Sequence, residues 1–188
     1  MPATRSRPTV LAVTLPSATI TLVPLSGTII ERRLKETEFV ATVAGVDRPV
    51  RFVDEWPGEL LGIFPVFAAA LSGNEAALGQ YIVVDNERAL AVGALGILGE
   101  VTRDRSIEIG YGMNSSDRGR GFAGAAVALL VKGLFERRVL PTRIDLITAK
   151  TAVGNLASQR VLEKNNFVRT GTEVSDEDGD LVIWELQP

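Results

Sequence analysis

The N-terminal part of the chain changes from an alternating apolar pattern to a helical one. Residues 19–24 alternate apolar and polar side chains as a half-buried strand does. Thr28 and Glu31 then have the spacing of a capping box, which predicts a helix whose apolar positions continue to Val43. A further helical segment is predicted over residues 59–71 and is interrupted by its internal proline.

From residue 80 onward, strand-like runs are more frequent than helical ones. Residues 80–85 and 89–98 flank a turn at Asn86 and Glu87, which predicts a hairpin, and residues 106–113 alternate as a further strand. The remaining predicted elements, in chain order, are a helix over 123–137, a strand over 143–148, a helix that begins after Asn155, and a hairpin of strands 167–174 and 181–186.

This order of elements indicates the α/β (α+β) class. It predicts a central, mostly antiparallel mixed sheet of about seven strands flanked by about four helices. We expect residues 19–188 to form this single domain. Residues 1–18 are predicted to be a flexible lead-in, because Pro8 and Pro16 flank an apolar run that is too short for a secretory signal.

Composition narrows the possible chemistry. Hydrophobic residues make up 46 % of the 188 residues, which supports one domain with a sizeable core. The chain has no histidine and no cysteine, so disulfides, thiolate metal sites, serine–histidine triads and the common zinc sites are excluded, and we expect no metal. The net charge of −3, with no basic patch among aromatic residues, argues against a nucleic-acid partner.

The apolar segments are short for a membrane protein. No apolar run in the sequence approaches the ~20 residues of a membrane span, so the sequence predicts a cytoplasmic protein without a membrane partner. It leaves open whether the protein is a monomer or a homodimer.

A glycine-rich turn separates strand 106–113 from the helix that follows it. Backbone N–H groups at a helix N-terminus lack partners and lie at the positive end of the helix dipole, so such a turn binds anions. Glycine lets the backbone approach a phosphate without an intervening side chain. The turn therefore predicts a phosphate-bearing ligand, and its candidate binding residues are Arg118, Gly119, Arg120, Gly121, Phe122, Ala123 and Gly124.

Two known patterns overlap in this turn. Residues 119–124 match the G-x-G-x-x-G fingerprint of dinucleotide-binding domains. Arg118, Gly121 and Ala123 also resemble the Arg/Gln-x-x-Gly-x-Gly/Ala signature of the GNAT superfamily of N-acetyltransferases. A dinucleotide fold needs several further strand–helix units and an acidic residue about 20 positions later. Asp145 comes later than that and lies within a strand, so coenzyme A is favoured over a dinucleotide-binding oxidoreductase.

A second segment strengthens the resemblance. Residues 155–167 look like the Asn-x-x-Ser-x-x-x-Leu-x-x-x-Gly-Phe segment of the GNAT branch that contains the ribosomal-protein N-terminal acetyltransferases. The chain departs from this pattern at two positions. Asn166 replaces the usual glycine before Phe167, which is tolerable because asparagine adopts left-handed conformations. Leu162 stands where many members place a tyrosine general acid, so Ser158 becomes the candidate proton donor.

The resemblance implies the GNAT fold and acetyl-CoA as cosubstrate. It implies transfer of an acetyl group to a primary amine, either a protein N-terminus or a small amine. The absence of cysteine fits direct attack in a ternary complex rather than an acetyl-cysteine intermediate. The backbones of Tyr111 and Met113 are expected to bind the pantetheine arm and thioester. Asn155 and Ser158 are expected to contact the cofactor from the following helix.

Two further residues are candidates on the acceptor side. Glu108 shares a strand face with Gly110 and Gly112 by period-two alternation, so its carboxylate is a candidate base for the acceptor amine, with Glu100 and Asp85 as alternatives. Trp56 is a candidate wall of the acceptor pocket. An alternative function is also open. Leu162 at the tyrosine position, together with the absence of histidine and cysteine, fits a coenzyme-A-binding sensor or interaction module that has lost catalysis.

Overall fold

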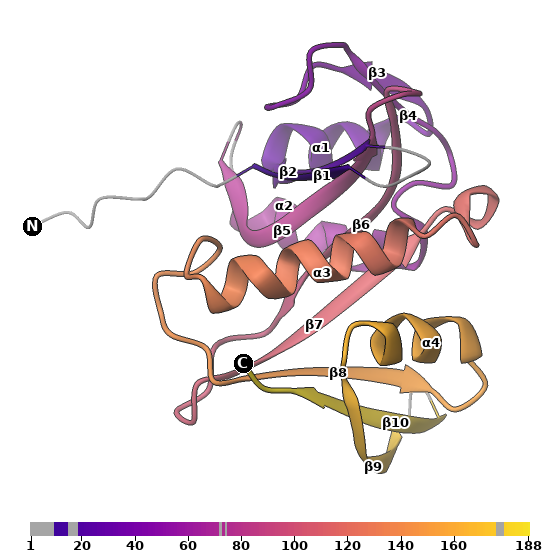
Figure 1. The fold of residues 1–188 in the computed structure, drawn as a ribbon. Coiled ribbons are helices and arrows are strands. Elements are labelled where there is room, and N and C mark those ends of the chain that lie inside the picture. Colours follow the sequence, from indigo (N-terminus) through magenta and orange to yellow (C-terminus); the bar gives the residue numbers. More distant parts are fainter. Residues whose placement is uncertain (1–9, 15–18, 72, 74, 176–178) are drawn as a thin grey trace, which may run out of the picture.

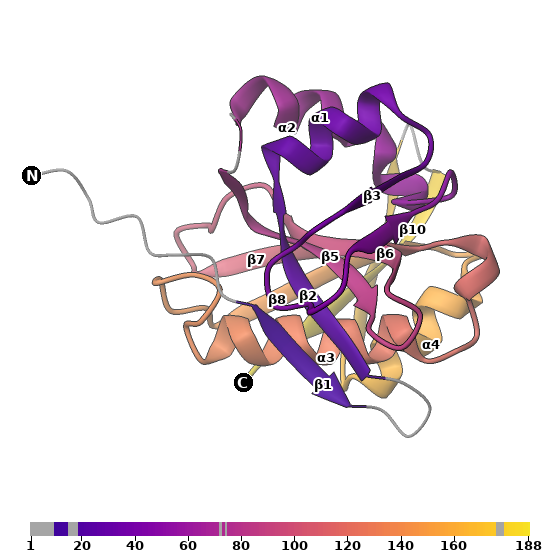
Figure 2. The ribbon, with the colours of Figure 1, turned by 90° about the horizontal axis from the view of Figure 1, so that it is seen from above.

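A twisted, mostly antiparallel sheet runs through the molecule and carries helices on both faces (Figures 1 and 2). The computed structural model of the chain describes residues 10–14, 19–71, 73, 75–175 and 179–188. The 10-stranded sheet of the described residues has eight strands in one path: β1 (Leu11–Thr14), β2 (Thr19–Ser26), β5 (Ala76–Asp85), β6 (Leu90–Leu98), β7 (Ser106–Met113), β8 (Leu146–Ala152), β10 (Gly179–Leu186) and β9 (Val168–Ser175). Beside this path, β3 (Phe39–Ala41) pairs with β4 (Val50–Phe52), and β4 also pairs with β6.

The helices divide between the two faces of the sheet (Figure 2). On one face lie α1 (Gly27–Lys35), α2 (Phe64–Ala70) and the short 3₁₀ helix η1 (Gly58–Ile63). On the other lie α3 (Phe122–Phe135) and α4 (Leu156–Lys164), and the short 3₁₀ helix η2 (Ser115–Asp117) leads into α3. No helix in the described part of the chain is long and apolar enough to cross a membrane.

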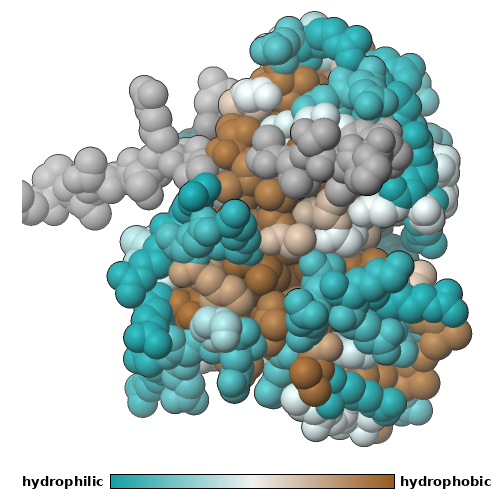
Figure 3. All heavy atoms as spheres, in the orientation of Figure 1, coloured by the Kyte–Doolittle hydropathy of each residue, from teal (hydrophilic) through white to brown (hydrophobic). Residues whose placement is uncertain are grey.

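Each face of the sheet has its own apolar core. The residues of β5 and β6 are almost all buried because helices cover both faces of these central strands. Leu130 and Leu134 of α3 pack into one core, while Ile30 of α1 and Phe64 of α2 pack into the other. Hydrophobic residues gather across the middle of the face on which α3 lies, between hydrophilic ones (Figure 3).

The class and the order of the predicted long elements are confirmed, but the sheet has more strands than the sequence predicts. The additional strands β1, β3 and β4 span only three or four residues each, which is too short for a readable alternation. The flexible lead-in over residues 1–18 needs correction, because Leu11–Thr14 pairs with β2 as strand β1. Residues 1–9 and 15–18 of this segment lie outside the described part, as do residues 176–178 of the final hairpin.

The first helix also differs from its prediction at both ends. Its N-cap is Ser26, whose Oγ accepts a hydrogen bond from Ile29 N at 3.4 Å, so the capping box at Thr28 and Glu31 is wrong. The helix ends at Lys35 rather than at Val43. Phe39 instead stacks on Phe52 across the β3–β4 pair with ring centroids 4.5 Å apart, and this contact favours a strand.

Strands β7 and β8 separate after a short stretch of parallel pairing. They pair only from Ser106↔Leu146 to Glu108↔Thr148. Beyond these pairs, β7 continues to Met113 along β6, and β8 continues to Ala152 along β10. A wedge therefore opens between the two strands, and Figure 1 shows them diverging toward η2 and α4.

Candidate active site

The wedge exposes main-chain groups of β7 that have no partner strand. Asn114 N donates to Val92 O of β6 at 2.9 Å. Successive peptide groups along a strand point to opposite sides, so the N–H groups of Met113 and Tyr111 point away from β6 and into the wedge. A ligand lying in the wedge can therefore add hydrogen bonds to β7 as a further strand does.

The glycine-rich turn lies at the open end of the wedge and is built to bind an anion. Gly121 is the N-cap of α3 with φ +83°, and Gly119 has φ +76°. In the described part of the chain, no oxygen accepts a hydrogen bond from the backbone N–H groups of residues 119–124. These residues lead into the first turn of the 14-residue helix α3. These donors and the helix dipole together favour a negatively charged group.

Two arginines beside the turn are held only loosely. Arg118 Nη2 lies 3.6 Å from Glu59 Oε1, and the side chain of Arg118 is 59 % exposed. Arg120 Nη1 lies 3.5 Å from Asp117 Oδ1, and its guanidinium carbon is 5.1 Å from the centroid of the Phe122 ring. Exposed ion pairs of this length contribute little to stability, so both guanidinium groups are available to an anionic ligand.

Helix α4 begins opposite the turn, on the β8 side of the wedge. Asn155 caps it through Oδ1, which accepts a hydrogen bond from Ser158 N at 3.1 Å, so the helix begins after Asn155 as predicted. No described residue accepts a bond from Asn155 Nδ2, so this amide group is free to donate to a ligand. Asn166 has φ +64°, as expected for a residue that replaces glycine at a helix end.

Tyr111 connects β7 to α4. Its hydroxyl donates to the main-chain oxygen of Ser158 at 3.0 Å, and its ring packs against the core that includes α3. This contact places the first turn of α4 beside β7 near the wedge.

Both tyrosines of the chain are expected to ionise late in an alkaline titration. Burial raises the pKa of Tyr81 and the pKa of Tyr111 to about 12. An unfolded tyrosine ionises near pH ~10, so the neutral side chains stabilise the fold below that pH, and this contribution is lost as the pH rises through about 12. An ultraviolet absorbance titration should show both ionisations late, and Tyr111→Phe should remove one of them. Tyrosine ionisation near pH ~10 in the folded protein is the contrary result.

Glu108 lies where the wedge begins. It occupies the last paired position between β7 and β8, and its neighbour on β6 is Leu98. Gly110 and Leu98 line a narrow crevice under α2, so the face of β7 that carries Glu108 and Gly110 is the face on the α2 side.

A lysine accompanies Glu108 on the neighbouring strand. Lys150 of β8 donates to Glu173 Oε2 at 2.8 Å. The pKa of Lys150 is raised, first by the hydrogen bond to Glu173 and also by the charge of Glu108. The wedge therefore carries a carboxylate–ammonium–carboxylate series on its α2 side, a cluster that the sequence analysis did not identify because its members come from three strands.

The alternative bases are less favourably placed. Asp85 is 1 % exposed and accepts a hydrogen bond from Arg88 Nε at 2.5 Å, so its carboxylate is not open to a substrate. Glu100 is exposed in the loop after β6. Glu108 is thus the best placed of the three candidates.

Trp56 does not form the wall of an open pocket, which corrects the sequence-based assignment. Its side chain is 0 % exposed, and Nε1 donates to Gly93 O at 2.9 Å. Phe52 and Phe64 contact it edge-to-face with ring centroids 4.7 Å and 5.5 Å away, so it is a core residue. The residue after Trp56 approaches strand β7 instead, because a Cβ built on Gly112 would lie 3.5 Å from Pro57 O.

Comparison with known proteins identifies the family. The family described as "Acetyltransferase (GNAT) domain" matches residues 34–168. The chain belongs to the GNAT acetyltransferases. A relative in Bacillus subtilis (strain 168), named "Uncharacterized N-acetyltransferase YjdG", is 32 % identical over 117 residues, which cover 61 % of this chain and 67 % of the relative. The protein is therefore an N-acetyltransferase of the GNAT family.

Solved GNAT structures share the fold over nearly the whole chain. A GNAT-family acetyltransferase from Bacillus anthracis superposes with a TM-score of 0.63 at 15 % identity, covering 94 % of this chain and 98 % of that one. RimJ from Mycobacterium smegmatis, solved in complex with CoA-disulfide, superposes with a TM-score of 0.60 at 22 % identity, covering 96 % and 88 %. The GNAT fold, with its mostly antiparallel sheet, contradicts the alternative of a dinucleotide-binding oxidoreductase.

Proposed function

We propose that this GNAT protein transfers the acetyl group of acetyl-CoA to a primary amine by direct attack in a ternary complex. The observation that carries the proposal is the exposed glycine-rich turn at the start of α3, located at the open end of the β7–β8 wedge. The turn supplies donors for the pyrophosphate, and the main-chain groups of Tyr111 and Met113 supply partners for the pantetheine arm. Asn155 Nδ2 adds a donor from α4.

The reaction requires one proton to leave and another to be supplied. The amine nitrogen forms a bond to the thioester carbonyl carbon, the carbon–sulfur bond breaks, and the coenzyme leaves as a thiolate. Glu108 accepts the proton of the attacking amine, directly or through a water molecule. Ser158 is the proposed proton donor to the thiolate, because Leu162 is buried and has no hydroxyl.

The acceptor approaches from the α2 side of the sheet. A crevice there reaches Gly110 and is lined mainly by apolar side chains. Its lining residues include Leu25, Leu60, Ile63, Phe64, Phe67 and Gln80.

The apolar lining of this crevice favours an acceptor with an apolar group beside its amine, such as a protein N-terminus or a small monoamine. An α-amine, with a pKa near ~8, also needs less help from a base than a lysine amine does. An acceptor of this kind suits a site in which Glu108 is the best placed candidate base.

Two measurements test the proposal. Calorimetric titration should show binding of acetyl-CoA and none of NAD. An acceptor panel should show turnover with peptides bearing a free N-terminus or with small monoamines. Binding of acetyl-CoA without turnover on any acceptor would favour the sensor function. Failure to bind acetyl-CoA or CoA would contradict the proposal as a whole.

A further inference from the structure

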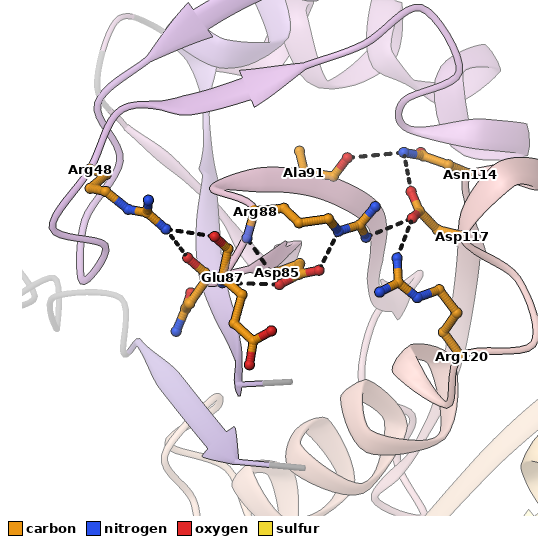
Figure 4. Close-up of polar contacts among 9 residues, drawn as sticks. Arg48, Asp85, Glu87, Arg88, Ala91, Asn114, Asp117 and Arg120 are labelled. Atoms are coloured by element: carbon orange, nitrogen blue, oxygen red, sulfur yellow. Dashed lines mark hydrogen bonds and ion pairs between the residues drawn. The ribbon is translucent and has the colours of Figure 1, made fainter. Parts of the chain in front are cut away.

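A buried pair of carboxylates lies behind the glycine-rich turn, and one arginine bridges them (Figure 4). Asp85 and Asp117 are 1 % and 2 % exposed. Arg88 Nε donates to Asp85 Oδ2 at 2.5 Å, and Arg88 Nη2 donates to Asp117 Oδ1 at 2.6 Å. A buried carboxylate is costly unless it is paired and hydrogen-bonded, so Arg88 stabilises both.

The bridge joins two segments that are distant in the chain. Asp85 ends β5, and Arg88 lies in the turn before β6. Asp117 ends η2, directly before the glycine-rich turn. The guanidinium carbon of Arg88 is also 5.7 Å from the centroid of the Phe122 ring, and Phe122 is the first residue of α3. Arg88 thus contacts the elements on both sides of residues 118–121.

A buried asparagine holds the second oxygen of Asp117. Asn114 Nδ2 donates to Asp117 Oδ2 at 3.2 Å and to Ala91 O of β6 at 3.0 Å. With Arg88 on Oδ1 and Asn114 on Oδ2, the carboxylate of Asp117 is fixed from two directions. The position of η2 relative to β6 follows from these contacts.

Arg120 is a second, weaker partner of Asp117. Its Nη1 lies 3.5 Å from the same oxygen that Arg88 binds at 2.6 Å, and its side chain is 45 % exposed. Because Arg88 holds this oxygen at the shorter distance, Arg120 is not the main counter-ion of Asp117. Without Arg88, the buried charge of Asp117 would attract Arg120 away from the turn and from an incoming anion.

We propose that Arg88 is a positioning residue for cofactor binding. It fixes Asp117, so residues 118–121 keep their anion-binding conformation, and it leaves Arg120 free to bind a phosphate group of the coenzyme. This inference rests on the proposed use of the turn as the coenzyme A site.

The test compares Arg88→Met with two other variants. Arg88→Met is expected to weaken acetyl-CoA binding by about 10- to 100-fold, with kcat at saturating acetyl-CoA changed by about threefold or less. Arg88→Lys should restore part of the affinity. It keeps the positive charge but lacks the planar guanidinium that binds Asp85 and Asp117 through separate nitrogens. Arg48→Met is the matched control. Arg48 donates to Asn86 O at 2.6 Å and to Glu87 O at 2.8 Å, in the turn that also contains Arg88. Neither bond involves η2, so the affinity for acetyl-CoA should not change.

A double variant separates the proposed role from a general loss of stability. In Arg88→Met/Asp117→Asn the carboxylate that attracts Arg120 is neutral, and Asp85 keeps its hydrogen bonds from the backbone N–H groups of residues 87 and 88. This protein should therefore fold and bind acetyl-CoA more tightly than Arg88→Met does. Wild-type affinity in a folded Arg88→Met protein would overturn the inference. So would a double variant that binds no better than Arg88→Met.

Hydrogen exchange gives a readout without ligand. The hydrogen-bonded amides that flank the turn, those of Asn114, Asp117, Arg118 and Ala125, are expected to exchange faster in Arg88→Met, or in the double variant if the single one does not fold, and at the wild-type rate in Arg48→Met. If the wild-type protein fails to bind acetyl-CoA, the proposed function is wrong, and unchanged exchange in these variants would then refute the positioning role by itself.

Discussion

Gly121→Val is expected to lower the affinity for acetyl-CoA by about 100-fold or more. Gly121 has φ +83°, a conformation that valine reaches only at a cost of about 1–2 kcal/mol. Relaxation of the backbone would turn the N–H groups of the turn away from the anion. Each charge-assisted hydrogen bond lost in this way costs about 1.5–3 kcal/mol. Calorimetric titration with acetyl-CoA measures the effect.

Gly99 offers a matched control for this variant. It is also exposed, has φ +73° and has no atom within 4 Å of a Cβ built on it, but it lies in the loop after β6. Gly99→Val should therefore show a similar loss of thermal stability with unchanged affinity. Equal losses of affinity in both variants would mean that Gly121 acts through general strain rather than through the anion site.

Glu108→Gln is expected to lower turnover by about 10²–10⁴-fold while acetyl-CoA affinity stays nearly intact. The amide cannot accept the proton of the acceptor amine. The loss should shrink as the pH rises toward the pKa of the amine, because more of the acceptor is then neutral without help. The pH profile of kcat/KM for the acceptor is the measurement.

Glu173→Gln is the matched control for the base. Glu173 contacts the same lysine, with Lys150 Nζ 2.8 Å from its Oε2, but it lies on β9. Its loss should have a small effect on turnover, and so should Ser158→Ala, because a thiol with a pKa near ~8.5 leaves readily at neutral pH. Normal turnover with an unchanged pH profile in Glu108→Gln would assign the proton transfer to water or to another carboxylate.

The cofactor side of the site could be predicted from the sequence because its features are local. The turn at Gly121, the cap at Asn155 and the left-handed Asn166 each depend on the preferences of a few consecutive residues. The hairpin of β5 and β6 can also be predicted from the sequence, because an apolar run on each side of a turn is typical of a hairpin.

The acceptor side depends on contacts between distant parts of the chain. Trp56 looked like a pocket residue in sequence, yet the aromatic packing of Phe52 and Phe64 places it in the core. The effect of Glu108 on Lys150 follows from strand pairing between β7 and β8, which no short pattern encodes. The strands β3 and β4 form because Phe39 and Phe52 meet, although each is too short to show a period.

The sequence by itself determined the family, the order of the long elements and the anion-binding turn. Local backbone preference and periodicity are properties of neighbouring residues, so they can be read along the chain. Only the tertiary structure decided which side chains meet around that turn. Arg88 and Asp117 are separated by 29 positions and interact only because β5, β6 and η2 converge. Asp117 is buried at this point, so the loss of either partner of the ion pair destabilises the fold.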